Sequence, residues 1–194
     1  MPAVCIDIDN VLARTDEIMR EVIYEHTHGR VKFDYQDIVE FDYWKCKDQS
    51  GNGITKKEWT RIHDLFSEPR YLWKVLPYSG AIRELRRLAK TFDIHVATSR
   101  LPKARKTTID WIESFGFPPH DLHFVKHGQK HVSLGTFVAA VEDHYEQAAD
   151  FAKSGTPCFL LEHPWNSRKP RRKNLFRVKT WSELRSQLLD RVTV

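Results

Sequence analysis

The sequence has little cysteine and no long hydrophobic run. Its three cysteines, Cys5, Cys46 and Cys158, are scattered and form no CxxC pair. Their odd number and wide spacing argue against a disulfide framework or a zinc–cysteine centre, and they favour a reducing, cytoplasmic location. No apolar run approaches the roughly 18 residues of a membrane span. The first residues lack the basic start and apolar stretch of a signal peptide, so we expect no membrane partner.

The composition is typical of a soluble globular chain. Hydrophobic residues make up 41% of the 194 residues, which is enough for one domain, or one domain with an insertion, to bury a sizeable core. The formal net charge of +5 suits an anionic ligand without proving one.

Short apolar runs recur along the chain and predict buried strands. They lie at 3–8, 93–98, 122–125, 137–142 and 157–161. Continuous apolar runs of this length favour strands buried on both faces, as in a parallel sheet. Helical patterns separate them: one follows Ser79, one begins at Pro102, and others cover 144–153 and 181–191. The alternation predicts an α/β fold, with ligands at the carboxyl ends of the strands.

The stretch 14–78 interrupts this rhythm because it has helical patterns, at 15–28 and 55–67, but no strong β run. Thr55 and Glu58 form a capping-box pattern at the start of the second helix. We expect 14–78 to be a mostly helical cap inserted into a core made of 1–13 and 79–194. The segment 46–54 is expected to be its flexible loop.

Acidic side chains follow the first predicted strand. Asp7 and Asp9 are two residues apart, so an extended chain sends both to the same side. Two neighbouring carboxylates repel unless a cation or a proton lies between them, and oxygen ligands favour Mg²⁺. Taken alone, this pattern fits a strand that ends in an Asp-Asn turn equally well.

Other strand ends supply the groups that phosphoryl transfer needs. Thr98 ends the second predicted strand and is followed by Ser99 and Arg100. Glu142 ends the fourth and is followed by Asp143. Lysines precede the acidic pair at positions 126 and 130. Carboxylates for a metal and a nucleophile, with hydroxyls and a cation for phosphate oxygens, predict phosphoryl transfer.

These motifs, in this order, resemble those of the haloacid dehalogenase superfamily of phosphohydrolases. They read DIDNV at 7–11, ATSR at 97–100, a lysine, and VED at 141–143. The chain is also similar to the 5′(3′)-deoxyribonucleotidase branch, which is the cytosolic type C 5′-nucleotidase family, through CIDIDNVLA at 5–13, LPYSGAIREL at 76–85 and EHPWN at 162–166. It departs from that pattern at Asn10, where glycine is common, and at Glu142, where aspartate is usual.

The resemblance implies a Rossmann-like parallel sheet with a helical cap, and a role for each motif residue. Asp7 would attack phosphorus and become an aspartyl-phosphate, and Asp9 would act as general acid and base. Thr98 and a lysine would hold the phosphoryl group, and we favour Lys130 over Lys126 because its spacing is closer to the family's. Asp7, the backbone carbonyl of Asp9, and Glu142 or Asp143 would hold Mg²⁺.

The expected substrate is a nucleoside monophosphate. Ser99, Arg100, Lys126 and Trp44 are the residues that we expect to contact it. Of the four cap aromatics Trp44, Trp59, Tyr71 and Trp73, one or two are expected to face the ligand. Alternative substrates are another small phosphometabolite or a nucleic-acid phosphate end. Alternatives of another class are a phospho-Asp regulatory module and a non-catalytic binding protein.

Two further patterns are weaker. His123, His127 and His131 have the spacing of one helix face, but the first falls in a predicted strand, so surface or loop positions are expected rather than a zinc site. The basic segment 168–173 is expected to be a solvated loop or to attract an anionic substrate, with nucleic-acid binding as the remaining alternative.

Overall fold

The computed structural model describes residues 1–116 and 119–192. Within these ranges, six parallel strands form one sheet in the order β3-β2-β1-β4-β5-β6. The strands are β1 (Ala3–Asp7), β2 (Asp93–Thr98), β3 (Asp121–Phe124), β4 (Ala139–Glu142), β5 (Cys158–Leu161) and β6 (Leu175–Val178). The predicted α/β fold is confirmed. All five predicted strands are present, β2 with the predicted bounds and the other four with slightly different ends.

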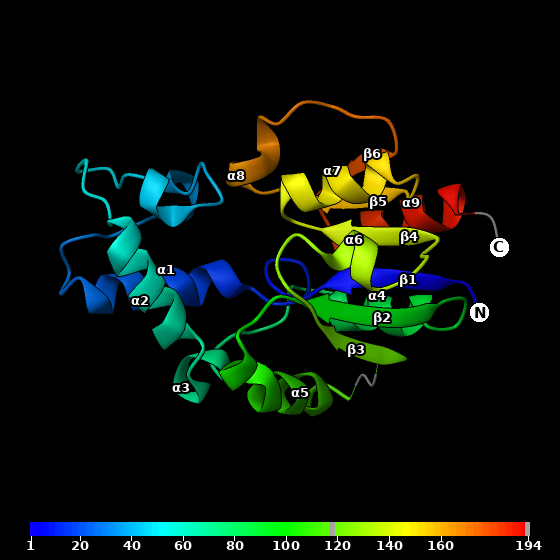
Figure 1. Cartoon of the computed structure of the whole chain (residues 1–194), viewed down its shortest axis with the longest axis horizontal. Coiled ribbons are helices and arrows are strands. Elements are labelled where there is room, and N and C mark those ends of the chain that lie inside the picture. The colour runs from blue at the N-terminus through cyan, green and yellow to red at the C-terminus, as the bar shows by residue number, and fades with distance from the viewer. Residues whose placement is uncertain (117–118, 193–194) are drawn as a thin grey trace.

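Helices cover both faces of the sheet, as Figure 1 shows. On one face, α4 (Ala81–Leu88), α5 (Arg105–Ser114) and α9 (Trp181–Arg191) bury leucines and tryptophans against Val4, Ile6 and Val96. On the other face, α7 (Tyr145–Lys153) packs its alanines against Cys5, Ala97 and Ala140. Alternate residues of β1 therefore serve two separate cores, which is why its sequence reads as one continuous apolar run.

Two predicted helix starts differ in detail from the structure. The helix expected after Ser79 has Gly80 as its N-cap, with φ at +79°, a left-handed conformation that glycine adopts without a steric penalty. Pro102 begins a 3-10 turn, η3 (Pro102–Ala104), and α5 follows it directly. No helix among the described residues is both long and apolar enough to cross a membrane.

The segment between β1 and α4 is helical, as expected. It contains α1 (Thr15–His26), η1 (Tyr35–Asp37), η2 (Tyr43–Lys45), α2 (Lys56–Phe66) and α3 (Pro69–Leu72). Figure 1 shows these elements beyond the edge of the sheet at which the strands end. The backbone N–H of Arg14 donates to the carbonyl of Leu76, and that of Tyr78 donates to Leu12, each at 2.8 Å. These bonds support our proposal that 14–78 is a cap joined to the core at one place.

Local hydrogen bonds organise the cap. The predicted capping box is present at the start of α2, where Thr55 accepts a hydrogen bond from the backbone N–H of Glu58 and Glu58 accepts one from that of Thr55. In the segment 46–54, the Asp48 carboxylate accepts backbone hydrogen bonds from Lys32, Ser50 and Asn52 at 2.8–3.0 Å. This segment has no regular structure, but the Asp48 carboxylate holds its turn in place.

Candidate active site

A buried lysine lies between two carboxylates at the carboxyl edge of the sheet. Asp7 ends β1 and Glu142 ends β4, which are neighbouring strands. Lys130, on the short helix α6 (Lys130–Ser133), is 2.7 Å from Asp7 Oδ1 and 2.9 Å from Glu142 Oε1. Its side chain is 2% exposed, so both ion pairs are shielded from water. Of the two lysines that the motif spacing allowed, Lys130 reaches the nucleophile candidate, whereas Lys126 is exposed.

Three carboxylates at this edge lie close enough together to hold a divalent cation. Asp7, Glu142 and Asp143 each offer an oxygen, and these oxygens lie within 4.8 Å of one another. Glu142 Oε2 is buried and has no hydrogen-bond partner among the described residues. An all-oxygen set with a free, buried acceptor fits a hard ion such as Mg²⁺.

The pKa values of the acidic pair reflect this crowding of buried carboxylates. Burial raises the pKa of Glu142 to about 8, although Lys130 opposes the shift. Burial, and then the charges of Asp7 and Glu142, raise the pKa of Asp143 well above its ordinary value. Burial and mutual repulsion therefore disfavour the charged forms of these two groups, and a bound cation would offset that penalty.

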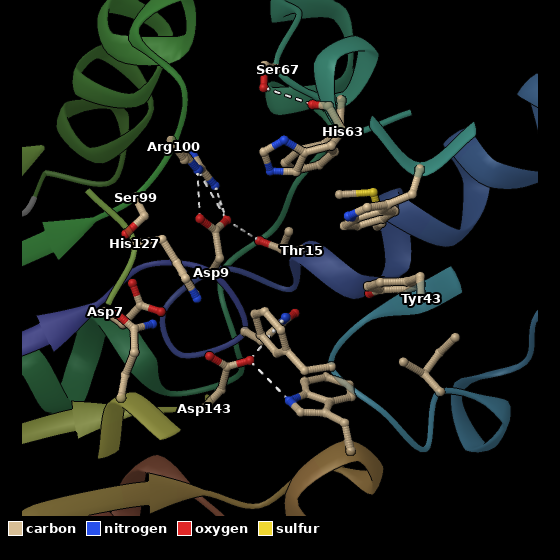
Figure 2. Close-up of a pocket in the computed structure, with 18 of the residues that line it drawn as sticks. Asp7, Asp9, Thr15, Tyr43, His63, Ser67, Ser99, Arg100, His127 and Asp143 are labelled. Atoms are coloured by element: carbon tan, nitrogen blue, oxygen red, sulfur yellow. Dashed lines mark hydrogen bonds and ion pairs between the residues drawn. The ribbon is translucent and has the colours of Figure 1, made fainter. Parts of the chain in front are cut away.

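Asp9 lies apart from this cluster and is held in one orientation by its neighbours. Arg100 Nη2 donates to Asp9 Oδ1 at 2.8 Å, and Thr15 Oγ1 donates to the same oxygen at 2.6 Å. Thr98 Oγ1 donates to Asp9 Oδ2 at 3.4 Å. Burial opposes ionisation of Asp9, but the Arg100 charge and these hydrogen bonds outweigh it and lower the pKa of Asp9. Figure 2 shows Arg100 and Thr15 around the Asp9 carboxylate.

Asn10 fixes the turn that separates Asp9 from α1. Its φ is +57°, a left-handed conformation in which asparagine is the best tolerated non-glycine residue, which explains why it can replace the usual glycine. Its side chain accepts from the backbone N–H of Asp16 at 2.8 Å and donates to Asp143 Oδ2 at 3.3 Å. Asn10 therefore connects the turn after β1 to the acidic pair after β4.

The EHPWN motif at 162–166 forms a second support for the same turn. His163 Nε2 lies 2.8 Å from the carbonyl oxygen of Asn10, and its Nδ1 lies 2.8 Å from Tyr35 Oη in the cap. The carbonyl requires a proton on Nε2, so Nδ1 accepts from the tyrosine. Trp165, on α8 (Pro164–Ser167), donates its indole N–H to Asp143 Oδ2 at 3.2 Å. Sequence reasoning noted the motif but missed these roles.

A cavity of about 240 Å³ opens between the sheet edge and the cap. Its polar floor includes Asp7, Asp9, Ser99, Arg100 and Lys130, and aromatic side chains of the cap form part of its wall (Figure 2). Ser99 Oγ is buried without a partner among the described residues, so it is available to a ligand. The aromatic and histidine residues of the lining are Phe41, Tyr43, Trp59, His63, Phe66, His127 and Trp165.

Several predicted contact residues lie elsewhere in the described structure. Of the four cap aromatics, Trp59 lines the cavity, while Trp44 packs against Trp59 with ring centroids 6.0 Å apart and stays outside the lining. Lys126 is also outside it. Phe41 and Tyr43, which sequence reasoning did not select, line the cavity instead.

The two weaker sequence patterns also have defined positions. His127 lines the cavity, whereas His123 lies in β3 and His131 packs against Phe151, so the three do not share one helix face. In the basic segment, Arg171 and Arg172 line a separate hollow beside β6 and α9.

Comparisons with known structures agree with the fold. A haloacid dehalogenase-like hydrolase from Streptococcus pneumoniae is 11% identical and matches 97% of this chain and 98% of its own, with a TM-score of 0.66. CbbY from Rhodobacter sphaeroides, in complex with phosphate, is 15% identical over 95% and 96% of the two chains, with a TM-score of 0.59. The HAD-hydrolase YfnB from Bacillus subtilis, bound to magnesium, is 11% identical over 97% and 98%, with a TM-score of 0.60.

Fold and site together define a phosphohydrolase of the haloacid dehalogenase superfamily. A search of curated proteins found no match. A family model does match residues 1–192, nearly the whole chain, and its description is "5′ nucleotidase, deoxy (Pyrimidine), cytosolic type C protein". The chain belongs to this family, so the resemblance drawn from the sequence motifs is confirmed.

Proposed function

We propose that the protein is a Mg²⁺-dependent phosphatase that hydrolyses nucleoside monophosphates through an aspartyl-phosphate. The observation that carries the proposal is the position of Asp7. It lies at the floor of the cavity, beside the buried ammonium group of Lys130. The carboxylates of Glu142 and Asp143 are close enough to share a metal ion with it. The family match supports the nucleotide substrate, and the magnesium-bound relative supports the choice of ion.

The residues divide the reaction into two steps. In the first, an Asp7 oxygen forms a bond to phosphorus while the bond to the leaving oxygen breaks, and Asp9 supplies the proton that this oxygen needs. In the second, Asp9 takes a proton from water, whose oxygen attacks phosphorus and releases Asp7 and inorganic phosphate. Lys130 and Ser99 offer donors to the phosphoryl oxygens throughout.

The metal would be held by Asp7, Glu142 and Asp143. It would supply positive charge between an anionic nucleophile and an anionic substrate. Burial raises the pKa of Asp7 even though Lys130 lies beside it, so a second cation favours the ionised form that can attack. Asn10 and Trp165 both donate hydrogen bonds to Asp143 Oδ2, which fixes the orientation of this carboxylate.

The cap wall supports a base rather than a bare sugar. Phe41 lies at the cavity, packed against His127 and His144 with ring centroids 6.2 and 4.1 Å apart, and it offers a planar surface. Stacking of a base on an aromatic ring contributes about 1–3 kcal/mol. A sugar phosphate has no flat face to gain this contact.

The test compares kcat/KM for nucleoside monophosphates and for ribose 5-phosphate at fixed Mg²⁺ and salt. We expect nucleotides to be preferred by about tenfold or more, which corresponds to one stacking contact. Phe41→Leu should reduce this preference, whereas Trp44→Leu, which alters a neighbouring aromatic outside the cavity lining, should leave it unchanged. Equal rates for both substrates would discard the nucleotidase assignment and leave a phosphatase for another small phosphometabolite.

Asp7→Asn tests the chemistry separately from the substrate. The amide cannot form an acyl phosphate, so turnover and the trapping of phosphate on the protein should both be lost. Removal of Mg²⁺ with EDTA should abolish activity, and added Mg²⁺ should restore it. Wild-type turnover by Asp7→Asn would contradict the nucleophile assignment.

A further inference from the structure

Two histidines and an aspartate meet on the sheet face that carries α7, away from the cavity. In the parallel pairing of β2 with β3, His95 lies opposite Asp121, and Ala97 lies opposite His123. Side chains two residues apart in a strand share a face, so His95, Asp121 and His123 all point to the same side. That side is the one on which Cys5, the partner of His95 in β1, faces the core under α7.

The three side chains approach one another closely. His95 Nδ1 lies 2.9 Å from His123 Nε2, and the two rings are within 3° of parallel. Asp121 Oδ2 lies 3.5 Å from the same His123 Nε2. One ligand atom from each residue falls within 4.8 Å of the other two. His95 and His123 are partly buried, which limits the orientations their rings can adopt.

These distances are close to those of a tetrahedral metal site. Zinc–nitrogen and zinc–oxygen bonds of about 2.0–2.2 Å place neighbouring ligand atoms roughly 3.3–3.5 Å apart. The 3.5 Å between His123 Nε2 and Asp121 Oδ2 already matches this ligand–ligand distance. The 2.9 Å between the two histidine nitrogens is shorter, and a small rotation of one ring would lengthen it. In the metal-free pair, the two nitrogens share a proton, and a metal takes the place of that proton.

We propose that His95, Asp121 and His123 form a binding site for a transition-metal ion of the Zn²⁺ type, with water as the fourth ligand. The site is chemically distinct from the cluster at Asp7. Imidazole nitrogens select Zn²⁺, Cu²⁺ or Ni²⁺, whereas the all-oxygen cluster selects Mg²⁺.

Occupation of this site would fasten β3 to β2. β3 is the edge strand of the sheet, and the chain that leaves it leads directly to α6 and Lys130. An ion held by ligands from both strands would therefore restrict the movement of β3, which precedes Lys130 in the chain. It would stabilise the fold without entering the reaction.

The test uses the full chain without a histidine tag, in excess Mg²⁺ so that the oxygen cluster is occupied. Zn²⁺ binding is measured by equilibrium dialysis, and Co²⁺ is used as a probe because its visible absorption reports a tetrahedral nitrogen-containing site. We expect one equivalent of Zn²⁺, a tetrahedral Co²⁺ spectrum, and a higher melting temperature with Zn²⁺. His123→Ala and His95→Ala should each weaken Zn²⁺ binding by at least tenfold.

Asp121→Asn provides a variant at an exposed position, where failure to fold is not a concern. It should also weaken Zn²⁺ binding and alter the Co²⁺ spectrum. His131→Ala removes a histidine on α6 that lies outside the cluster, and it should bind Zn²⁺ like the wild type. Zn²⁺ affinity unchanged in the His95, His123 and Asp121 variants, or no binding to the wild type below about 100 μM Zn²⁺, would overturn the proposal.

Discussion

The central prediction concerns Lys130, whose removal should destabilise the fold as well as stop catalysis. Its ammonium group contacts Asp7 at 2.7 Å and Glu142 at 2.9 Å in a buried environment. At an effective dielectric constant of 20, each pair is worth about 6 kcal/mol before the cost of desolvation. Replacement by methionine fills much of the same volume but leaves two buried carboxylates without their cation.

Breaking a buried ion pair from one side typically costs about 3–5 kcal/mol. For a domain of this size, each kcal/mol lowers the melting temperature by about 2–4 °C, so Lys130→Met should lower it by about 6–20 °C. The measurement is urea and thermal unfolding in EDTA, followed by circular dichroism. Lys106→Met is the matched control, because Lys106 forms an exposed ion pair with Asp110 and should be replaceable with little loss.

A double-mutant cycle identifies the cause of the loss. Glu142→Gln removes one of the two stranded carboxylates, so Lys130→Met should cost less in the Glu142→Gln background, by about 1–3 kcal/mol. Added Mg²⁺ should also recover part of the stability of Lys130→Met, because it supplies charge to the same carboxylates. A loss below 1 kcal/mol, or strict additivity in the cycle, would refute the view that Lys130 is held by these two charges.

The pKa of Glu142 is raised to about 8, so protons compete with the metal for this carboxylate below that pH. Mg²⁺ affinity measured by calorimetry should therefore fall at least tenfold from pH 8 to pH 6, and Mg²⁺ binding should release a proton. Glu142→Gln should weaken this pH dependence. Arg100 lowers the pKa of Asp9, so Arg100→Met should raise that pKa. Because Asp9 must be protonated to act as the general acid, the basic limb of the kcat/KM profile should move to higher pH, and an unmoved limb would contradict this coupling. Asn10→Ala puts alanine at a positive φ and removes two hydrogen bonds, so it should lower the unfolding free energy by more than 1 kcal/mol, whereas Asn10→Gly should recover the backbone part of that loss alone.

The central strands of the sheet were predictable because they are largely buried on both faces. Runs such as that of β1 are continuous and apolar, and their order along the chain implied a parallel sheet. β6 was missed because its sequence, Leu-Phe-Arg-Val, contains Arg177 and follows a basic segment. Arg177 is tolerated there because it donates to the carbonyls of Asn166 and Lys169 at the edge of the sheet. Hydrogen bonds that satisfy one charged residue in a strand leave no periodic pattern in the sequence.

The polar floor of the site was predictable for a related reason. The carboxyl ends of parallel strands meet at one edge, so polar residues that follow apolar runs were expected together. The cap wall was less predictable, because an aromatic at helical spacing packs equally well inward or toward a ligand. Trp44 and Trp59 lie close together, and only the fold distinguishes the residue that lines the cavity from the one behind it.

The entry and exit of the cap lie side by side, and this has a consequence for how substrate preference can change. The two chain segments that connect the cap to the core are joined by backbone hydrogen bonds, between Leu12 and Tyr78 and between Arg14 and Leu76. Between these bonds, Ala13 and Pro77 form an antiparallel bridge. The core is therefore continuous in space although it is interrupted in sequence. An insertion of different length or composition can begin and end at the same two points without shifting the strands that carry Asp7, Thr98 or Glu142. We infer that this junction would let the cap be exchanged, and substrate preference change with it, while the sheet stays unchanged.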